Sequence, residues 1–284
     1  MAETFSLDHA VISVRDRMDE AADRFTRLGF TLTPRGLHRS GSVNHLMVFG
    51  PDYLELIGFP PTPPVRPDLV DSPIGLDGLV LSLGDPSGVY EHLRSIDVPV
   101  DPPQPLSRPL ELDGRTEDVR FTTVRLPRGA IEGGRLYFCH HHTPQFIWRN
   151  EWREHENGAR SITRFTIAVP DPLASARRYA TILGQSAPIE AGAPVILNLG
   201  HALLELETPK SLRMRLGALA PDALDSNGKP RETYMAMVTI KTDSLAAAER
   251  AAVHGGFRPV RTGPINLAIA ARDAMNCTIM FEEM

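Results

Sequence analysis

Short apolar runs, each leading into a helical pattern, recur along this chain from its first residues onward. Residues 9–14 form the first run, and their β-branched side chains predict a strand. After Asp16, apolar residues recur at helical spacing as far as Leu28, and Gly29 is suited to a left-handed helix cap. Three more strand candidates follow, around 31–33, 44–49 and 53–57. The first unit is therefore expected to run strand, helix, strand, strand, strand.

The same unit recurs three more times. Apolar runs at 79–83, 165–169 and 237–240 are each followed by an acid (Asp85, Asp171 and Asp243) and then by a helical pattern. Closing strands are expected at 121–126, 135–140, 195–199, 202–207, 265–270 and 277–281. Repetition at this scale predicts an α+β protein built of four βαβββ units. A ferredoxin-like α+β array is the alternative that fits the same periodicity.

Breaks in the pattern divide the chain into two halves. We expect an N-terminal domain over residues 1–147, a connector over 148–161 and a C-terminal domain over 162–284. Trp148 and Trp152 indicate that the connector is packed rather than free. The proline-rich segment 59–73 joins the first two units, and we expect no regular structure there.

Composition narrows the range of partners and compartments. The formal net charge of -5 and the absence of a basic block argue against nucleic-acid binding. No apolar run approaches the roughly 20 residues of a membrane span, and the N-terminus lacks the pattern of a secretion signal. The two cysteines, Cys139 and Cys277, lie far apart in apolar segments and are expected to be buried thiols. A cytoplasmic protein with a small-molecule ligand is the expectation, with a homodimer as a further one.

Candidate chemistry appears on the first and last strands of the first unit. Alternation places His9 and Ser13 on the face opposite the apolar set that packs against the helix. The same reasoning turns Tyr53 and Glu55 toward the hollow side of the sheet. A carboxylate among apolar neighbours is costly to bury unless it is paired or bound to a metal. His9 and Glu55 therefore predict half of a divalent-metal site for Zn, Ni, Mn or Fe.

The second unit offers less certain ligands. In the register set by Asp16 and Asp85, the position that matches His9 is Gly78, which has no side chain. His140 or His141 on the closing strand would complete a triad, but a register shift of one residue reverses the face. His45, with Asn44 and Arg39, is a candidate for the mouth of the substrate pocket.

Three segments carry a resemblance to a known family: 7–14 (LDHAVISV), 53–57 (YLELI) and 139–144 (CHHHTP) running into Trp148 and Arg149. On these residues the chain resembles the glyoxalase-like branch of the vicinal-oxygen-chelate superfamily. The resemblance implies that two βαβββ units form each domain, with a curved mixed sheet whose hollow holds a divalent metal. It favours His141 over His140 as the third ligand and implies a catalytic role for Glu55.

The second half departs from this pattern. Arg164 stands where His9 would be, and Ala236 occupies the matching place in the fourth unit. Glu205 and Glu207 lie on the fitting strand without an imidazole. Because a guanidinium cannot ligate a metal, Arg164 and Glu205 are expected to form an ion pair. This half is expected to be a degenerate glyoxalase-like copy.

Three functions remain open at this point. The first is a metal-dependent lyase, isomerase or extradiol-type dioxygenase that acts on a small oxygenated substrate. The second is a non-catalytic binding protein of the drug-resistance type on the same fold, and the third is a structural partner without a ligand. The sequence has no Walker loop, dinucleotide fingerprint, nucleophile elbow or HExxH motif.

Overall fold

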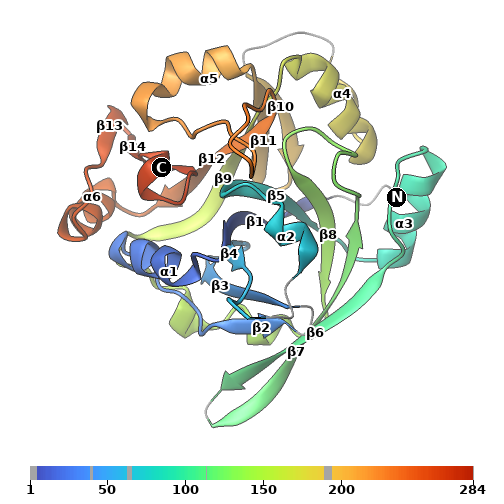
Figure 1. Ribbon diagram of the computed structural model, residues 1–284, viewed down its shortest axis with the longest axis horizontal. Coiled ribbons are helices and arrows are strands. Elements are labelled where there is room, and N and C mark those ends of the chain that lie inside the picture. Colours follow the sequence, from blue (N-terminus) through green and yellow to red (C-terminus); the bar gives the residue numbers. More distant parts are fainter. Residues whose placement is uncertain (1–4, 39–40, 63–65, 113, 189–193, 284) are drawn as a thin grey trace.

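Two curved sheets, one from each half of the chain, form the framework of the computed structural model (Figure 1). The structure describes residues 5–38, 41–62, 66–112, 114–188 and 194–283. Within these ranges, no helix is both long enough and apolar enough to cross a membrane.

The first sheet has eight strands in the order β2-β3-β4-β1-β5-β8-β7-β6. Their bounds are β1 Ser6–Arg15, β2 Gly36–His38, β3 Ser42–Val48, β4 Tyr53–Gly58, β5 Gly75–Ser82, β6 Gln104–Leu112, β7 Arg115–Arg125 and β8 Arg135–His141. Each unit contributes four strands, and the two units join where β1 pairs antiparallel with β5. The edge strands β2 and β6 also lie close together, so the sheet curls almost into a barrel.

The second sheet repeats this plan with seven described strands in the order β10-β11-β9-β12-β15-β14-β13. Their bounds are β9 Ala159–Ala168, β10 Val195–Leu199, β11 Ala202–Glu207, β12 Tyr234–Thr242, β13 Val260–Gly263, β14 Asn266–Ile269 and β15 Thr278–Glu283. The units join through β9 and β12, again antiparallel. The α+β class and the paired-unit architecture are thus as predicted.

The helices are α1 Met18–Arg27, α2 Pro67–Val70, α3 Pro86–Ser95, α4 Pro172–Ile182, α5 Pro209–Leu216 and α6 Leu245–His254. Helices α1, α3, α4 and α6 pack on the convex sides of the sheets, whereas α2 and α5 pack on the hollow sides through Leu69 and through Leu212 and Leu216. Two of the recurring acids cap helices: the Asp85 carboxylate accepts a hydrogen bond from Ser87 N, and that of Asp171 from Ala174 N. In the fourth unit, Ser244 takes this role instead of Asp243.

One continuous apolar core joins the two halves. It includes residues of both sheets, and the ring of Phe30 stacks on that of Phe281 with 5.9 Å between centroids. Asp52 reinforces the junction, because its buried carboxylate accepts hydrogen bonds from Ile162 N and lies 2.6 Å from His201 Nε2. β9 begins at Ala159, and the boundaries of the two domains remain a prediction.

Several elements differ from the sequence-based expectation. The strand expected at 31–33 is wrong: residues 31–35, which include Pro34, form no strand, and the second strand of the first unit is β2 at Gly36–His38. The short strand β13 was not expected either.

Strand β6 was not predicted because it contains Pro105 and Pro109. An edge strand tolerates proline where the missing N–H group would face away from the neighbouring strand. The proline-rich joint contains the single-turn helix α2, which was expected to be irregular. Both β6 and α2 matter for function, because β6 and the residue before α2 help to line the cavity described next.

Candidate functional site

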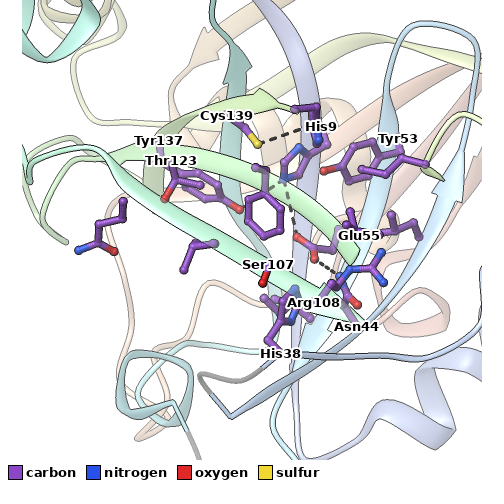
Figure 2. A pocket seen from close by; sticks show the side chains of 18 of the residues that line it. His9, His38, Asn44, Tyr53, Glu55, Ser107, Arg108, Thr123, Tyr137 and Cys139 are labelled. Carbon is purple, nitrogen blue, oxygen red and sulfur yellow. Dashed lines mark hydrogen bonds and ion pairs between the residues drawn. The ribbon is translucent and has the colours of Figure 1, made fainter. Parts of the chain in front are cut away.

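A cavity of about 350 Å³ occupies the hollow of the first sheet (Figure 2). Alternate residues of the strands point into it because side chains of one parity share a face. These residues are His9 from β1, Asn44 and Leu46 from β3, Tyr53, Glu55 and Ile57 from β4, Val119, Phe121, Thr123 and Arg125 from β7, and Tyr137, Cys139 and His141 from β8. Residues 104–108 of β6 close the remaining side, with His38, Arg66 and Ile147 at the margins.

His9 and Glu55 meet inside this cavity. His9 Nε2 lies 3.7 Å from Glu55 Oε2, and both side chains are more than nine-tenths buried. The strands that carry them are parallel neighbours, with His9 opposite Tyr53 and Val11 opposite Glu55. Tyr53 stacks on the imidazole at 4.2 Å between ring centroids, and Asn44 Nδ2 donates to Glu55 Oε1 at 2.6 Å. The two groups are therefore held in fixed orientations.

Asp8 is part of this site, although strand alternation alone would turn its side chain away. The pairing of β1 with β5 shifts between Leu7 and His9, so β1 carries one extra residue there. This bulge directs both Asp8 and His9 to the hollow side, while Leu7 and Ala10 both enter the core. The signal was present in the sequence, since two polar residues between Leu7 and Ala10 break strict alternation.

Asp8 connects two imidazoles. Its Oδ1 lies 2.5 Å from His9 Nδ1 and 3.0 Å from His141 Nε2. Burial alone would raise the pKa of Asp8, but the charge and hydrogen bonds of His141 and His9 outweigh it and lower the pKa. The pKa of His141 is raised, because its neighbours Cys139 and Asp8 outweigh the effect of burial. His9 is thereby oriented with Nε2 facing the cavity.

His141 lies on the cavity side, as preferred, but next to Asp8. Its Nε2 is 3.6 Å from Cys139 Sγ, and its Nδ1 is buried without a partner. Within the described ranges, Asp8, Cys139 and His141 are the one group of three histidine, cysteine or acidic residues with ligand atoms all within 4.8 Å of one another. His9 and Glu55 thus come together, whereas His141 is joined to them through Asp8.

The other predicted site residues lie elsewhere. Ser13 is fully buried and does not line the cavity. His45 pairs with Leu56, and its Nδ1 lies 2.8 Å from the carbonyl oxygen of Thr33, so it shares the face turned away from the hollow. His140 likewise turns away, toward the carbonyl oxygen of Leu83. Arg39 lies outside the described residues.

The second unit supplies different chemistry at the matching positions. Gly78 pairs with Val11, and Val80 pairs with both His9 and Tyr137. This pseudo-twofold register relates Gly78 to His9 and Tyr137 to Glu55. The Tyr137 hydroxyl lies 3.4 Å from His9 Nε2, and burial raises its pKa. A phenol thus stands where a second carboxylate would otherwise be.

The matching place in the C-terminal half contains the expected ion pair. Arg164 Nη1 lies 3.2 Å from Glu205 Oε1, and Arg164 Nη2 lies 3.5 Å from Glu282 Oε1. Thr166 Oγ1 donates to Glu205 Oε2. A second cavity of about 340 Å³ adjoins this group.

Solved structures with similar folds extend over nearly the whole chain. A hypothetical protein from Staphylococcus aureus aligns with a TM-score of 0.69 and 13% identity over 99% of this chain and 100% of that one. A mutant of 4-hydroxymandelate synthase from Streptomyces coelicolor aligns with a TM-score of 0.57 and 13% identity over 100% and 93% of the two chains. A xylose isomerase-like TIM barrel/4-hydroxyphenylpyruvate dioxygenase fusion protein aligns with a TM-score of 0.58 and 16% identity, covering 92% of this chain and 40% of that one.

Sequence comparison assigns the family. No functionally curated protein matches the chain. The family model of the glyoxalase-like domain matches residues 7–183, which cover the first sheet apart from Ser6 and extend into the second half. These residues make up more than half of the chain and contain His9, Glu55 and the whole cavity. The chain therefore belongs to the glyoxalase-like domain family.

Proposed function

We propose that the N-terminal half is a divalent-metal-dependent enzyme in which His9 and Glu55 are the two protein ligands of the cation. The observation that supports this most is the approach of His9 Nε2 and Glu55 Oε2 to 3.7 Å in the hollow of the first sheet, where both side chains are more than nine-tenths buried. An imidazole nitrogen and a carboxylate oxygen are a donor set that Zn, Ni, Mn and Fe accept.

The surroundings of His9 fit a ligand role. Metal-binding histidines usually donate their second ring N–H group to a carboxylate, which fixes the tautomer and the ring orientation. Asp8 Oδ1, at 2.5 Å from His9 Nδ1, is placed for this. Asn44 holds Glu55 in the same way from the opposite side.

The proposed reaction class is lyase, isomerase or dioxygenase chemistry on a small oxygenated molecule. The cation, when bound, would polarise adjacent oxygens of the substrate. Glu55, with one oxygen bonded by Asn44 and the other facing His9, is placed to take or return a substrate proton. The Tyr137 hydroxyl, kept protonated by burial, can donate a hydrogen bond to a developing oxyanion. Val119, Phe121 and Leu46 exclude water around these groups.

A binding protein without catalysis is the second candidate. It is favoured by the second unit, where Gly78 and Tyr137 replace two side chains that would have strengthened metal binding. In that case the cavity would hold an apolar ligand without a cation.

Metal content tests the proposal directly. Tag-free protein is loaded separately with Mn, Fe, Ni and Zn, desalted, and analysed for metal beside His9→Ala/Glu55→Ala. The wild type is expected to retain about one equivalent of at least one metal, and the double variant close to none. His142→Ala is the matched control, because His142 directly follows β8, is exposed and does not line the cavity, so its loss should not change the result.

Equal metal content in the wild type and the double variant, or none in either, would overturn the metal-dependent function. A ligand that stabilises the metal-free wild type in a thermal shift would then favour the binding protein.

A further inference from the structure

Positive charge dominates the polar lining of the cavity. Three arginines, Arg66, Arg108 and Arg125, line it, and Glu55 is the one carboxylate among the described lining residues. A charged group out of bulk water is costly unless an opposite charge or hydrogen bonds compensate. The partners of each arginine therefore indicate where a ligand charge is missing.

Two of the arginines have a counter-charge within the protein. Arg66 forms a bidentate pair with Asp68, at 2.7 and 2.6 Å. Arg108 is 3% exposed and is stabilised electrostatically by Glu55, although its Nη1 has no hydrogen-bond partner. With a cation on Glu55, this carboxylate would be shared, which makes the cavity still more positive.

Arg125 is different. It lies at the end of β7, on the same face as Thr123, and its Nε donates to Thr123 Oγ1 at 3.1 Å. Its guanidinium lies over the ring of Tyr137, 5.4 Å from the centroid. No described carboxylate comes within 4.0 Å of it, since Asp68 is occupied by Arg66 and Arg135. Its terminal nitrogens are free to form the two parallel hydrogen bonds that a carboxylate accepts.

Arg125 also has the right position relative to the proposed reaction centre. Tyr137 touches both groups: its ring lies under Arg125, and its hydroxyl lies 3.4 Å from His9 Nε2. One tyrosine side chain thus spans the distance between the guanidinium and His9. A ligand that fills this space would place its charged end a few bonds from the atoms that face His9 and Glu55.

We propose that Arg125 anchors a carboxylate of the substrate, so that the substrate class is a small oxygenated organic acid. This inference rests on the proposed function for the identity of the reacting end, but the anchoring contact itself does not require a metal. The apolar walls formed by Leu106 and Phe121 accommodate the body of such an acid.

Binding of a matched acid and amide tests the anchor. Benzoylformate carries a carboxylate beside a carbonyl oxygen on an apolar ring, and benzoylformamide is its neutral counterpart. Calorimetric titration of the metal-loaded wild type is expected to give at least about tenfold tighter binding of the acid. Arg125→Gln is expected to lower the affinity for the acid by about 10- to 100-fold and to leave the affinity for the amide unchanged.

Arg120→Gln is the control. It removes the same charge from the same strand, but Arg120 is exposed and does not line the cavity. Equal binding of acid and amide by the wild type, equal weakening of both by Arg125→Gln, or no binding of the acid would each overturn the anchor.

Two further measurements separate this proposal from the metal proposal. Arg125→Gln is expected to keep the metal content of the wild type. If the wild type retains no metal, acid binding by the metal-free wild type that is lost in Arg125→Gln would keep the anchor and reject only the metal proposal.

Discussion

The two halves place a carboxylate at the same register position and neutralise it in different ways. In the N-terminal half, Glu55 faces the imidazole of His9. In the C-terminal half, Arg164 takes the place of His9, and its guanidinium binds Glu205 and also reaches Glu282. The equivalent strands pair in the same way, so the backbone is not what distinguishes the two sites.

The difference lies in where the positive charge comes from. Arginine is a permanent cation without a lone pair, and it satisfies the carboxylate from within the chain. Histidine has a lone pair on Nε2 and leaves the carboxylate able to accept a cation from outside. One difference on the first strand thus separates a carboxylate that could hold an external cation from one that is neutralised within the chain.

Removing the guanidinium of Arg164 should have the largest effect on stability. Arg164→Ala leaves the buried Glu205 and Glu282 without their guanidinium, and we expect a loss of about 3 kcal/mol in the free energy of unfolding. Urea denaturation measures it. Arg160→Ala is the control on the same strand, because its partners Glu154 and Asp243 are exposed. An unchanged midpoint for Arg164→Ala would contradict a structural role for this ion pair.

The junction between the halves should respond to pH. Burial raises the pKa of Asp52 to about 6, and the hydrogen bond with His201 only partly opposes this. Because the folded pKa lies above the unfolded value, Asp52 favours folding most below about pH 4, and this contribution is lost as pH rises through 6. Relative to Asp52→Asn, the wild type should lose about 2 kcal/mol of stability between pH 4 and 7.

Denaturation at several pH values gives this difference. A constant difference between the wild type and Asp52→Asn would mean that folding does not raise the pKa of Asp52.

The last prediction concerns the orientation of the imidazole. Asp8→Asn keeps the shape of the side chain but loses the charge that holds both His9 and His141. If His9 is a ligand, metal affinity should fall by about 10- to 100-fold. Titration in a metal buffer measures it, and Thr163→Ala, the position in β9 that matches Asp8, is the control. An affinity equal to that of the wild type would show that Asp8 has no such role.

Much of the architecture was predictable because its signals are local. The four apolar runs, their helices and the shared face of His9 and Glu55 follow from periodicity within short segments. The Arg164–Glu205 pair was also predictable, because the register of the repeat carries it.

Long-range features were not predictable in the same way. The two polar residues between Leu7 and Ala10 show that alternation breaks there, but only the pairing with β5 identifies the break as a bulge that turns both Asp8 and His9 to the hollow side. His141 and Asp8 are 133 positions apart, so their contact depends on how β1, β5 and β8 line up. Arg125 lines a cavity only because β6 forms the wall opposite to it, and the prolines of β6 prevented the prediction of this strand.

The approach of β2 to β6 has a consequence for ligand entry. Among the described residues, these edge strands are neighbours without a ladder of backbone hydrogen bonds. Gly36 permits the close approach of β2 to β6, because a side chain there would collide with Asn44 and Arg108. Opening such a seam breaks few bonds, whereas separating any two paired strands breaks many. The long β6–β7 hairpin projects from the body of the molecule in Figure 1, and moving its β6 edge away from β2 would open the cavity without breaking the pairing of β1 with β4, the strands that carry His9 and Glu55.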